Sequence, residues 1–217
     1  MRRHFADCRI ENCRCESKRY WIILWIGLGI FIAEIIGGII SGSLALLSDA
    51  FHVLTDSVAY FVSIVVAYLV AKRGRDERKL RAVGGYINAT LLLIIAGWVM
   101  YEAAGRLFSP PKITSGLMIA VAVFGALGNL LQNYILEHAT AAEEAQVTHQ
   151  SAHLHVLSDL WQSIAVIAAG VLIAVTGWRL ADSILSIVIS LAMIYWSARL
   201  FRQSRREAKS DNADNSR

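Results

Sequence analysis

Two nearly identical pentapeptides carry the residues of this chain that are best suited to bind a metal ion: HVLTD at 52–56 and HVLSD at 155–159. Each copy places an imidazole and a carboxylate four residues apart within an apolar run. Residues at this spacing share one face of a helix, so both side chains of a copy would point the same way. Two imidazoles and two carboxylates suit a tetrahedral zinc ion, and the carboxylates offset its charge. The candidate metal ligands are therefore His52, Asp56, His155 and Asp159.

Both pentapeptides lie in long apolar runs, and these runs must position them. Hydrophobic residues make up 56% of the 217 residues and charged residues only 18%. A run of about 20 apolar residues is long enough for a helix to cross a bilayer, where the backbone has to satisfy its own hydrogen bonds. Six such runs occur, at 20–40, 44–71, 84–108, 114–137, 151–176 and 180–200. We therefore predict an all-α membrane protein with six transmembrane helices.

Lysine and arginine residues give the predicted orientation. They crowd into the segment before the first run, the link between the second and third runs, and the segment after the sixth run. The alternate links carry only Lys112 and Arg179. Because basic residues favour the cytoplasmic side, both termini are expected there, in a multi-pass protein of the bacterial inner membrane. This pattern accounts for the net charge of +4 without nucleic-acid binding.

The expected domain organisation follows from these runs. A basic, cysteine-containing cytoplasmic tail at 1–19 precedes a six-helix transmembrane domain at 20–203. A short cytoplasmic tail at 204–217 follows, and its polar, charged composition predicts a lack of regular structure.

The two pentapeptides are expected to face each other, because the second helix runs inward and the fifth runs outward. His52 would then approach Asp159, and Asp56 would approach His155. At 1.5 Å per residue, His52 lies about 12 Å from the outer start of its helix, and Asp159 lies about 25 Å from the outer end of its own. The fifth helix would have to shift or tilt, and good helix formers at 139–150 could extend it. The alternative is two separate His–Asp hydrogen bonds that hold the helices together.

Other polar residues in the apolar runs have two readings each. Asp49 shares the face of the first pentapeptide and either orients the His52 ring or is favoured by the helix dipole. Glu34 on the first helix either relays protons or is a protonated carboxyl bonded to a neighbouring helix. Asn129 on the fourth helix is expected to bond helices together, with a supporting role at the metal site as the other reading. Asp182, at the start of the sixth helix, is expected to cap a helix or to bind an interface partner.

A cysteine-containing segment precedes the first run. Its side chains Cys8, Cys13, Cys15 and His4 are candidates for metal capture, since soft thiolates suit zinc and cadmium. The spacing matches no closed zinc module, so a mobile, reduced tail is the other reading.

The stretches SLALLSDAFHVLTDS at 43–57 and SAHLHVLSDLWQSIAVIAAGVLI at 151–173 resemble the second and fifth helices of the cation diffusion facilitator family. GWRLADSILSIVISL at 177–191 resembles the start of that family's sixth helix. The resemblance covers roughly residues 20–203. It implies a homodimeric exporter that exchanges cytoplasmic zinc, or cadmium or cobalt, for protons, with the four candidate ligands as its transport site. The metal is cargo, and no resident cofactor is expected.

The chain departs from the family pattern after the sixth helix, where members usually carry a cytoplasmic metal-binding domain. It is therefore expected to be either a short subtype or a truncated chain, and its dimerisation would rest on the membrane helices. An intramembrane zinc hydrolase would need an open coordination position and a general base, and the sequence has no H-E-x-x-H motif. A non-transporting membrane metal sensor or partner subunit is the alternative function.

Overall fold

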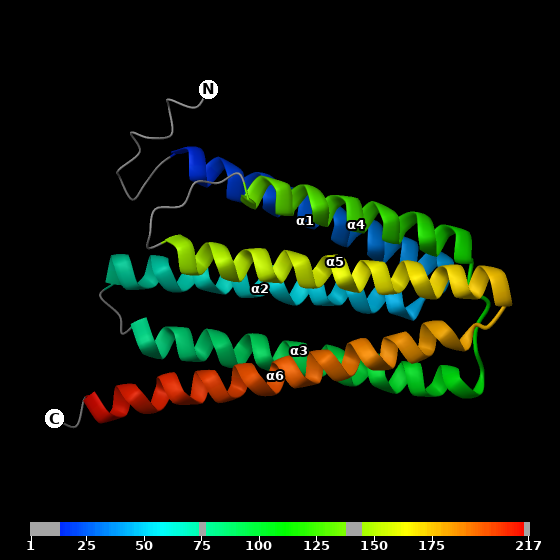
Figure 1. Cartoon of the computed structure of the whole chain (residues 1–217). Helices are drawn as coiled ribbons and strands as arrows, with labels where there is room; N and C mark the ends of the chain where they lie inside the picture. The colour runs from blue at the N-terminus through cyan, green and yellow to red at the C-terminus, as the bar shows by residue number, and fades with distance from the viewer. Residues whose placement is uncertain (1–13, 74–76, 138–144, 215–217) are drawn as a thin grey trace.

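The chain folds into consecutive α-helices in the computed structural model, whose backbone is described for residues 14–73, 77–137 and 145–214 (Figure 1). Side chains are described for most of these residues, and those of Asp56 and His155 are among the exceptions. The helices are α1 (Arg14–Ser41), α2 (Leu44–Arg73), α3 (Glu77–Phe108), α4 (Ser115–Glu137), α5 (Ala145–Thr176) and α6 (Leu180–Asp214).

Each of the six predicted apolar runs lies on one of these helices, so the all-α fold is confirmed. The helices are longer than the runs, since α3 begins at Glu77, α5 begins at Ala145 and α6 ends at Asp214. The added residues are largely Glu, Lys, Arg, Gln and Ala, which favour helix, so each helix continues after its apolar character ends. The prediction that the segment from residue 204 lacks regular structure is therefore wrong up to Asp214.

Five stretches of the described residues are long and apolar enough to cross a membrane, namely Leu24–Ser41, Ala82–Phe108, Ser115–Ile135, Asp159–Thr176 and Leu180–Arg206. Within its described part, α2 contributes a shorter apolar stretch, Leu44–Thr55. Large apolar side chains also cover the outside of the bundle: Trp25 is 64% exposed and Phe108 is 89% exposed. Because lipid is the solvent for such a surface, the chain is a multi-pass membrane protein.

In Figure 1 the helices lie in three layers, α1 and α4, α2 and α5, and α3 and α6. Among the described residues the closest packing joins α3 to α6 and α4 to α5, while α2 packs mainly on α1 and α3. The start of α1 and the end of α6 lie at the same end of the bundle. The other end holds the connections 41–44, 108–115 and 176–180, and we call it the turn end. Along α3 and α6, Ser197 Oγ donates to the carbonyl of Ala89 over 2.8 Å. Of the three layers in Figure 1, the middle one is formed by α2 and α5.

Glycines let α1 approach its neighbours closely. A Cβ at Gly37 would lie 2.6 Å from Cγ2 of Val121 on α4, and a Cβ at Gly38 would lie 2.7 Å from Cγ of Leu47 on α2. Small residues at such contacts allow dispersion contacts along the whole crossing, which drive helix association in lipid. The packing therefore holds α1 against both α2 and α4.

Candidate metal centre

His52 on α2 and Asp159 on α5 meet in the middle layer. The His52 Nε2 atom lies 3.7 Å from Asp159 Oδ1, and the two side chains are only 14% and 10% exposed. Two ligands of one tetrahedral zinc ion lie about 3.3 Å apart, given metal–ligand bonds of about 2.0–2.1 Å. The separation is therefore close to the distance that a shared zinc ion requires. The predicted approach of these two residues is present in the structure.

The difference in depth between the two residues is resolved by the different reach of their helices. Figure 1 shows α5 continuing past the start of α2 at the turn end. The first residues of α2 are accordingly buried, with Leu44, Ala45 and Leu46 each 0% exposed. Because α2 starts deeper in the bundle than the end of α5, His52, which lies two turns into α2, is level with Asp159.

The other two predicted ligands are placed by their helices only. Asp56 lies one turn beyond His52 on α2, and His155 lies one turn before Asp159 on α5. Their side chains lie outside the described residues. Among the side chains that are described, no group of three His, Cys, Asp or Glu could hold a metal ion. The four-ligand site stays a prediction.

Asp49 lies three residues before His52 and is 2% exposed. Its Oδ1 atom accepts a hydrogen bond of 2.5 Å from Gln162 Nε2, and its Oδ2 atom accepts one of 3.4 Å from Ser163 Oγ. Both donors belong to α5. This carboxylate therefore joins the two helices that carry His52 and Asp159.

Glu34 brings a third helix to the same place. It is 1% exposed on α1, and its carboxyl lies near those of Asp49 and Asp159. Neither of its oxygens accepts a hydrogen bond from a donor among the described residues. Glu34, Asp49 and Asp159 together form what we call the carboxyl cluster. The cluster gathers acidic groups from three helices in the interior of the bundle, where ionisable residues are rare and suggest a functional site.

Asn129 on α4 donates from Nδ2 to Ser163 Oγ over 3.4 Å and is 4% exposed. It therefore bonds α4 to α5, in line with the expected interhelical role. Gln162 and Ser163 were not singled out in the sequence, although their spacing contains a signal. Ser163 follows Asp159 by four residues and so shares its helix face.

The candidate metal-capture residues His4, Cys8 and Cys13 lie outside the described residues. Cys15 lies in the first turn of α1, and its side chain is also outside them. Their role stays a prediction.

Residues 20–207 match the model of the cation efflux transmembrane domain. The chain is 36% identical over 195 residues to the zinc transporter ZitB of Pectobacterium atrosepticum, with 87% of this chain and 60% of that protein covered. It is 39% identical over 166 residues to the metal cation efflux system protein CzcD of Cupriavidus metallidurans, with 74% and 51% covered.

A third relative is the cadmium, cobalt and zinc/H(+)-K(+) antiporter of Bacillus subtilis, which is 32% identical over 184 residues, with 82% of this chain and 59% of that protein covered. The chain thus spans about 60% of the length of the first of these relatives. The family model covers most of the chain, including all of the residues that build the carboxyl cluster. The chain belongs to the cation efflux family.

Proposed function

We propose that this chain exports divalent metal ions, zinc foremost, in exchange for protons, through a site formed by His52, Asp56, His155 and Asp159. The observation that carries the proposal is the meeting of His52 and Asp159, 3.7 Å apart, between two helices of a cation efflux protein. With the second pair of residues one turn away, two imidazoles and two carboxylates would surround the ion. Such a set supplies the nitrogen and oxygen ligands that zinc accepts.

Proton exchange follows from the ligand chemistry. Zinc binds neutral imidazole and ionised carboxylate, so protons and metal compete for one site. An imidazole titrates near pH 6.5 in its unperturbed state, within reach of the pH difference across an energised membrane. The site would load metal when it is open to the more alkaline cytoplasm and release it when it is protonated from the other side.

The carboxyl cluster gives the exchanged protons a place beside the metal. Glu34 belongs to α1 and lies near Asp49, which accepts hydrogen bonds from Gln162 and Ser163 on α5. We assign Glu34 the role of holding a proton when the site carries no metal. A buried carboxyl next to a second one needs a proton or a cation in order to remain buried.

Zinc is favoured over harder ions. Imidazole suits zinc and cobalt, whereas manganese and magnesium favour oxygen ligands in higher coordination numbers. The names of the relatives fit this order, since they specify zinc for ZitB, and cadmium, cobalt and zinc for the Bacillus subtilis antiporter.

We also propose that all six helices cross the membrane, with both ends of the chain in the cytoplasm. Two copies of the chain would associate through their membrane helices. The orientation rests on the basic residues, which gather at the end of the bundle opposite the turn end. The turn end carries Lys112 and Arg179, with Arg106 one turn inside α3.

The test is zinc flux in vesicles that hold the purified protein and a pH gradient. Wild type is expected to move zinc against protons, whereas Asp159→Ala and His52→Ala are expected to lose at least about 90% of the flux, because a metal-site ligand is removed. Thr90→Ala is the matched control, since Thr90 is exposed on α3 and bonds only to its own helix, at Tyr86.

Glu34→Gln in the same vesicles should keep zinc binding and slow the proton-coupled flux. Wild-type flux in both Asp159→Ala and His52→Ala would refute the site. Zinc binding by wild type without any flux would instead support a sensor or partner-subunit role.

A further inference from the structure

Helix α2 begins inside the molecule, which creates a problem for its backbone. The first amides of any helix have no partner within the helix, and in a buried setting each needs another acceptor. Ser43, Leu44, Ala45 and Leu46 are each 0% exposed. The acceptors for the start of α2 must therefore come from the protein.

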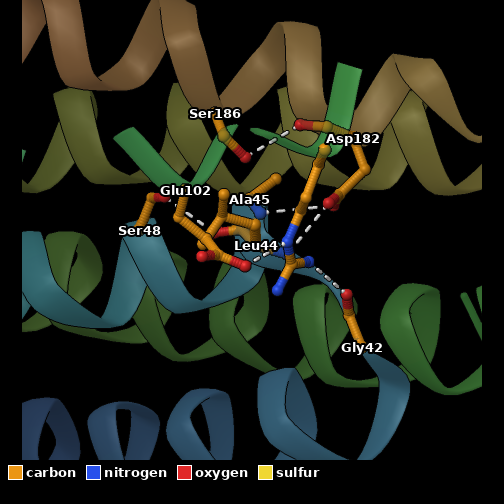
Figure 2. A network of polar contacts seen from close by, with 8 residues as sticks. Gly42, Leu44, Ala45, Ser48, Glu102, Asp182 and Ser186 are labelled. Carbon is orange, nitrogen blue, oxygen red and sulfur yellow. Dashed lines mark hydrogen bonds and ion pairs between the residues drawn. The ribbon is translucent and has the colours of Figure 1, made fainter. Parts of the chain in front are cut away.

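The carboxylate of Asp182, on the first turn of α6, supplies two of them (Figure 2). Its Oδ2 atom accepts from the Leu44 amide over 2.9 Å, and its Oδ1 atom accepts from the Ala45 amide over 3.2 Å. Ser43 Oγ donates to Oδ1 over 2.5 Å and itself accepts from the Leu46 amide over 3.1 Å. Asp182, 0% exposed, therefore caps a helix that lies more than 130 residues away in the sequence.

Helix α3 ties the same turn a second time. Arg106 Nη1 donates to the Gly42 carbonyl over 2.7 Å, while its Nε donates to Glu102 Oε1 over 2.9 Å. The Arg106 charge also attracts the Asp182 carboxylate. The turn between α1 and α2 is thus bound by both members of the α3–α6 pair.

These ties matter because they fix the start of α2, and a rigid helix carries that position along to His52. α2 packs mainly on α1 and α3, whereas α5 packs mainly on α4. The depth at which His52 meets Asp159 therefore depends on where α2 starts, together with the hydrogen bonds that Asp49 accepts from Gln162 and Ser163 on α5. From Leu44 to His52 is a rigid length of about 12 Å.

We propose that Asp182 is a positioning residue for metal transport: by fixing the start of α2 on α6, it sets His52 level with Asp159. This inference rests on the proposed function of the His52–Asp159 site. In this role Asp182 does more than cap a helix. A residue at the start of α2 could stabilise the first turn of that helix, but it could not fix α2 relative to α6.

An experiment can separate the two roles, because the cap on α2 can be restored without the link to α6. Asp182→Ala removes both the cap and the link to α6. Adding Ser43→Asp to Asp182→Ala supplies a carboxylate at the N-cap of α2, which can accept from the amides of its own first turn. The double variant therefore restores the cap without the link. Ser186→Ala is the control, since Ser186 Oγ bonds only the backbone carbonyl of Asp182, over 2.8 Å.

Three measurements are made on each purified protein: amide hydrogen exchange at the start of α2, zinc binding, and the KM for zinc in vesicles. In Asp182→Ala, the amides at the start of α2 should exchange faster than in wild type. The KM for zinc should rise by about tenfold or more, as loss of a supporting group at a metal site typically causes. The double variant should regain slow exchange and keep the raised KM. The control should match wild type throughout.

The inference is overturned if the double variant regains the wild-type KM, or if Asp182→Ala never departs from it. If Asp182→Ala fails to fold, Asp182→Asn takes its place. Asparagine keeps one acceptor oxygen and replaces the other with a donor toward the Leu44 amide. A wild-type KM in that variant also overturns the inference. A wild type that neither binds nor moves zinc would instead refute the proposed function. In that case the exchange data alone decide whether Asp182 fixes the start of α2.

Discussion

At the scale of single residues, the site could be read partly from the sequence. The spacing of His52 and Asp159 within their pentapeptides identified a pair that the structure places 3.7 Å apart. Gln162 and Ser163 escaped notice because neutral polar residues in apolar helices have many uses, and only the fold shows that both contact Asp49. Sequence periodicity gives the face of a helix, but it does not give the depth at which another helix crosses it.

Metal choice is the prediction at this scale. Replacing His52 by Asp would leave one imidazole and three carboxylates in the proposed ligand set, which is a harder and more negative site. We expect His52→Asp to broaden selectivity toward cadmium or manganese at the expense of zinc, whereas His52→Ala should mainly lose affinity. Competitive flux with mixed metals, in vesicles that hold each variant, measures the ranking. An unchanged ranking in His52→Asp would show that His52 does not select the metal.

At the scale of helices, apolar length predicted all six elements, while their ends needed the structure. The apolar run of α5 begins at residue 151, and only the helix formers at 139–150 indicated that the helix would start earlier, as it does at Ala145. Charged and polar helix formers carry α3, α5 and α6 beyond their apolar parts, and hydropathy does not detect them. The pentapeptides predicted that α2 faces α5, but the other helix contacts were out of reach, because they depend on small residues such as Gly37 meeting a specific partner.

Gly37→Ala tests this close packing. The new Cβ would lie 2.6 Å from Cγ2 and 2.9 Å from Cγ1 of Val121, whose short branched side chain has little room to turn. We expect the free energy of unfolding to fall by about 1–3 kcal/mol, as overpacking typically costs. Gly97→Ala is the matched control on α3, where a Cβ meets nothing within 4 Å, and alanine there should be neutral or stabilising. Thermal unfolding in detergent measures both, and equal melting temperatures would contradict the assignment of Gly37 to a tight contact.

At the scale of the whole molecule, the bundle separates two kinds of surface. Apolar side chains such as Ile39, 67% exposed, and Val175, 79% exposed, cover the flanks. The polar interior gathers between α1, α2, α4 and α5, where Glu34, Asp49 and Asn129 are each under 5% exposed. This reversal of the pattern in soluble proteins is what the proposed transport of metal and protons through the bundle requires.

Orientation is the prediction at this scale. In intact cells, a membrane-impermeant maleimide should leave the native cysteines unlabelled, because the basic segment that holds them is proposed to be cytoplasmic. In a chain with Cys8, Cys13 and Cys15 changed to serine, Lys112→Cys should be labelled from outside, since position 112 lies at the turn end and is exposed. Opening the cells should make the native cysteines reactive. The reverse pattern would place the termini outside.

The remote cap on α2 also has a consequence for how the protein is made. Leu44 and its acceptor on Asp182 are 138 residues apart, so the ribosome adds the second partner long after the first. At about 5–20 residues per second, the first helical hairpin would wait roughly 7–28 s before α6 arrives to receive its amides. During that interval the start of α2 has no final acceptor in the lipid phase. The cap on α2 can therefore be completed only after α6 has been synthesised.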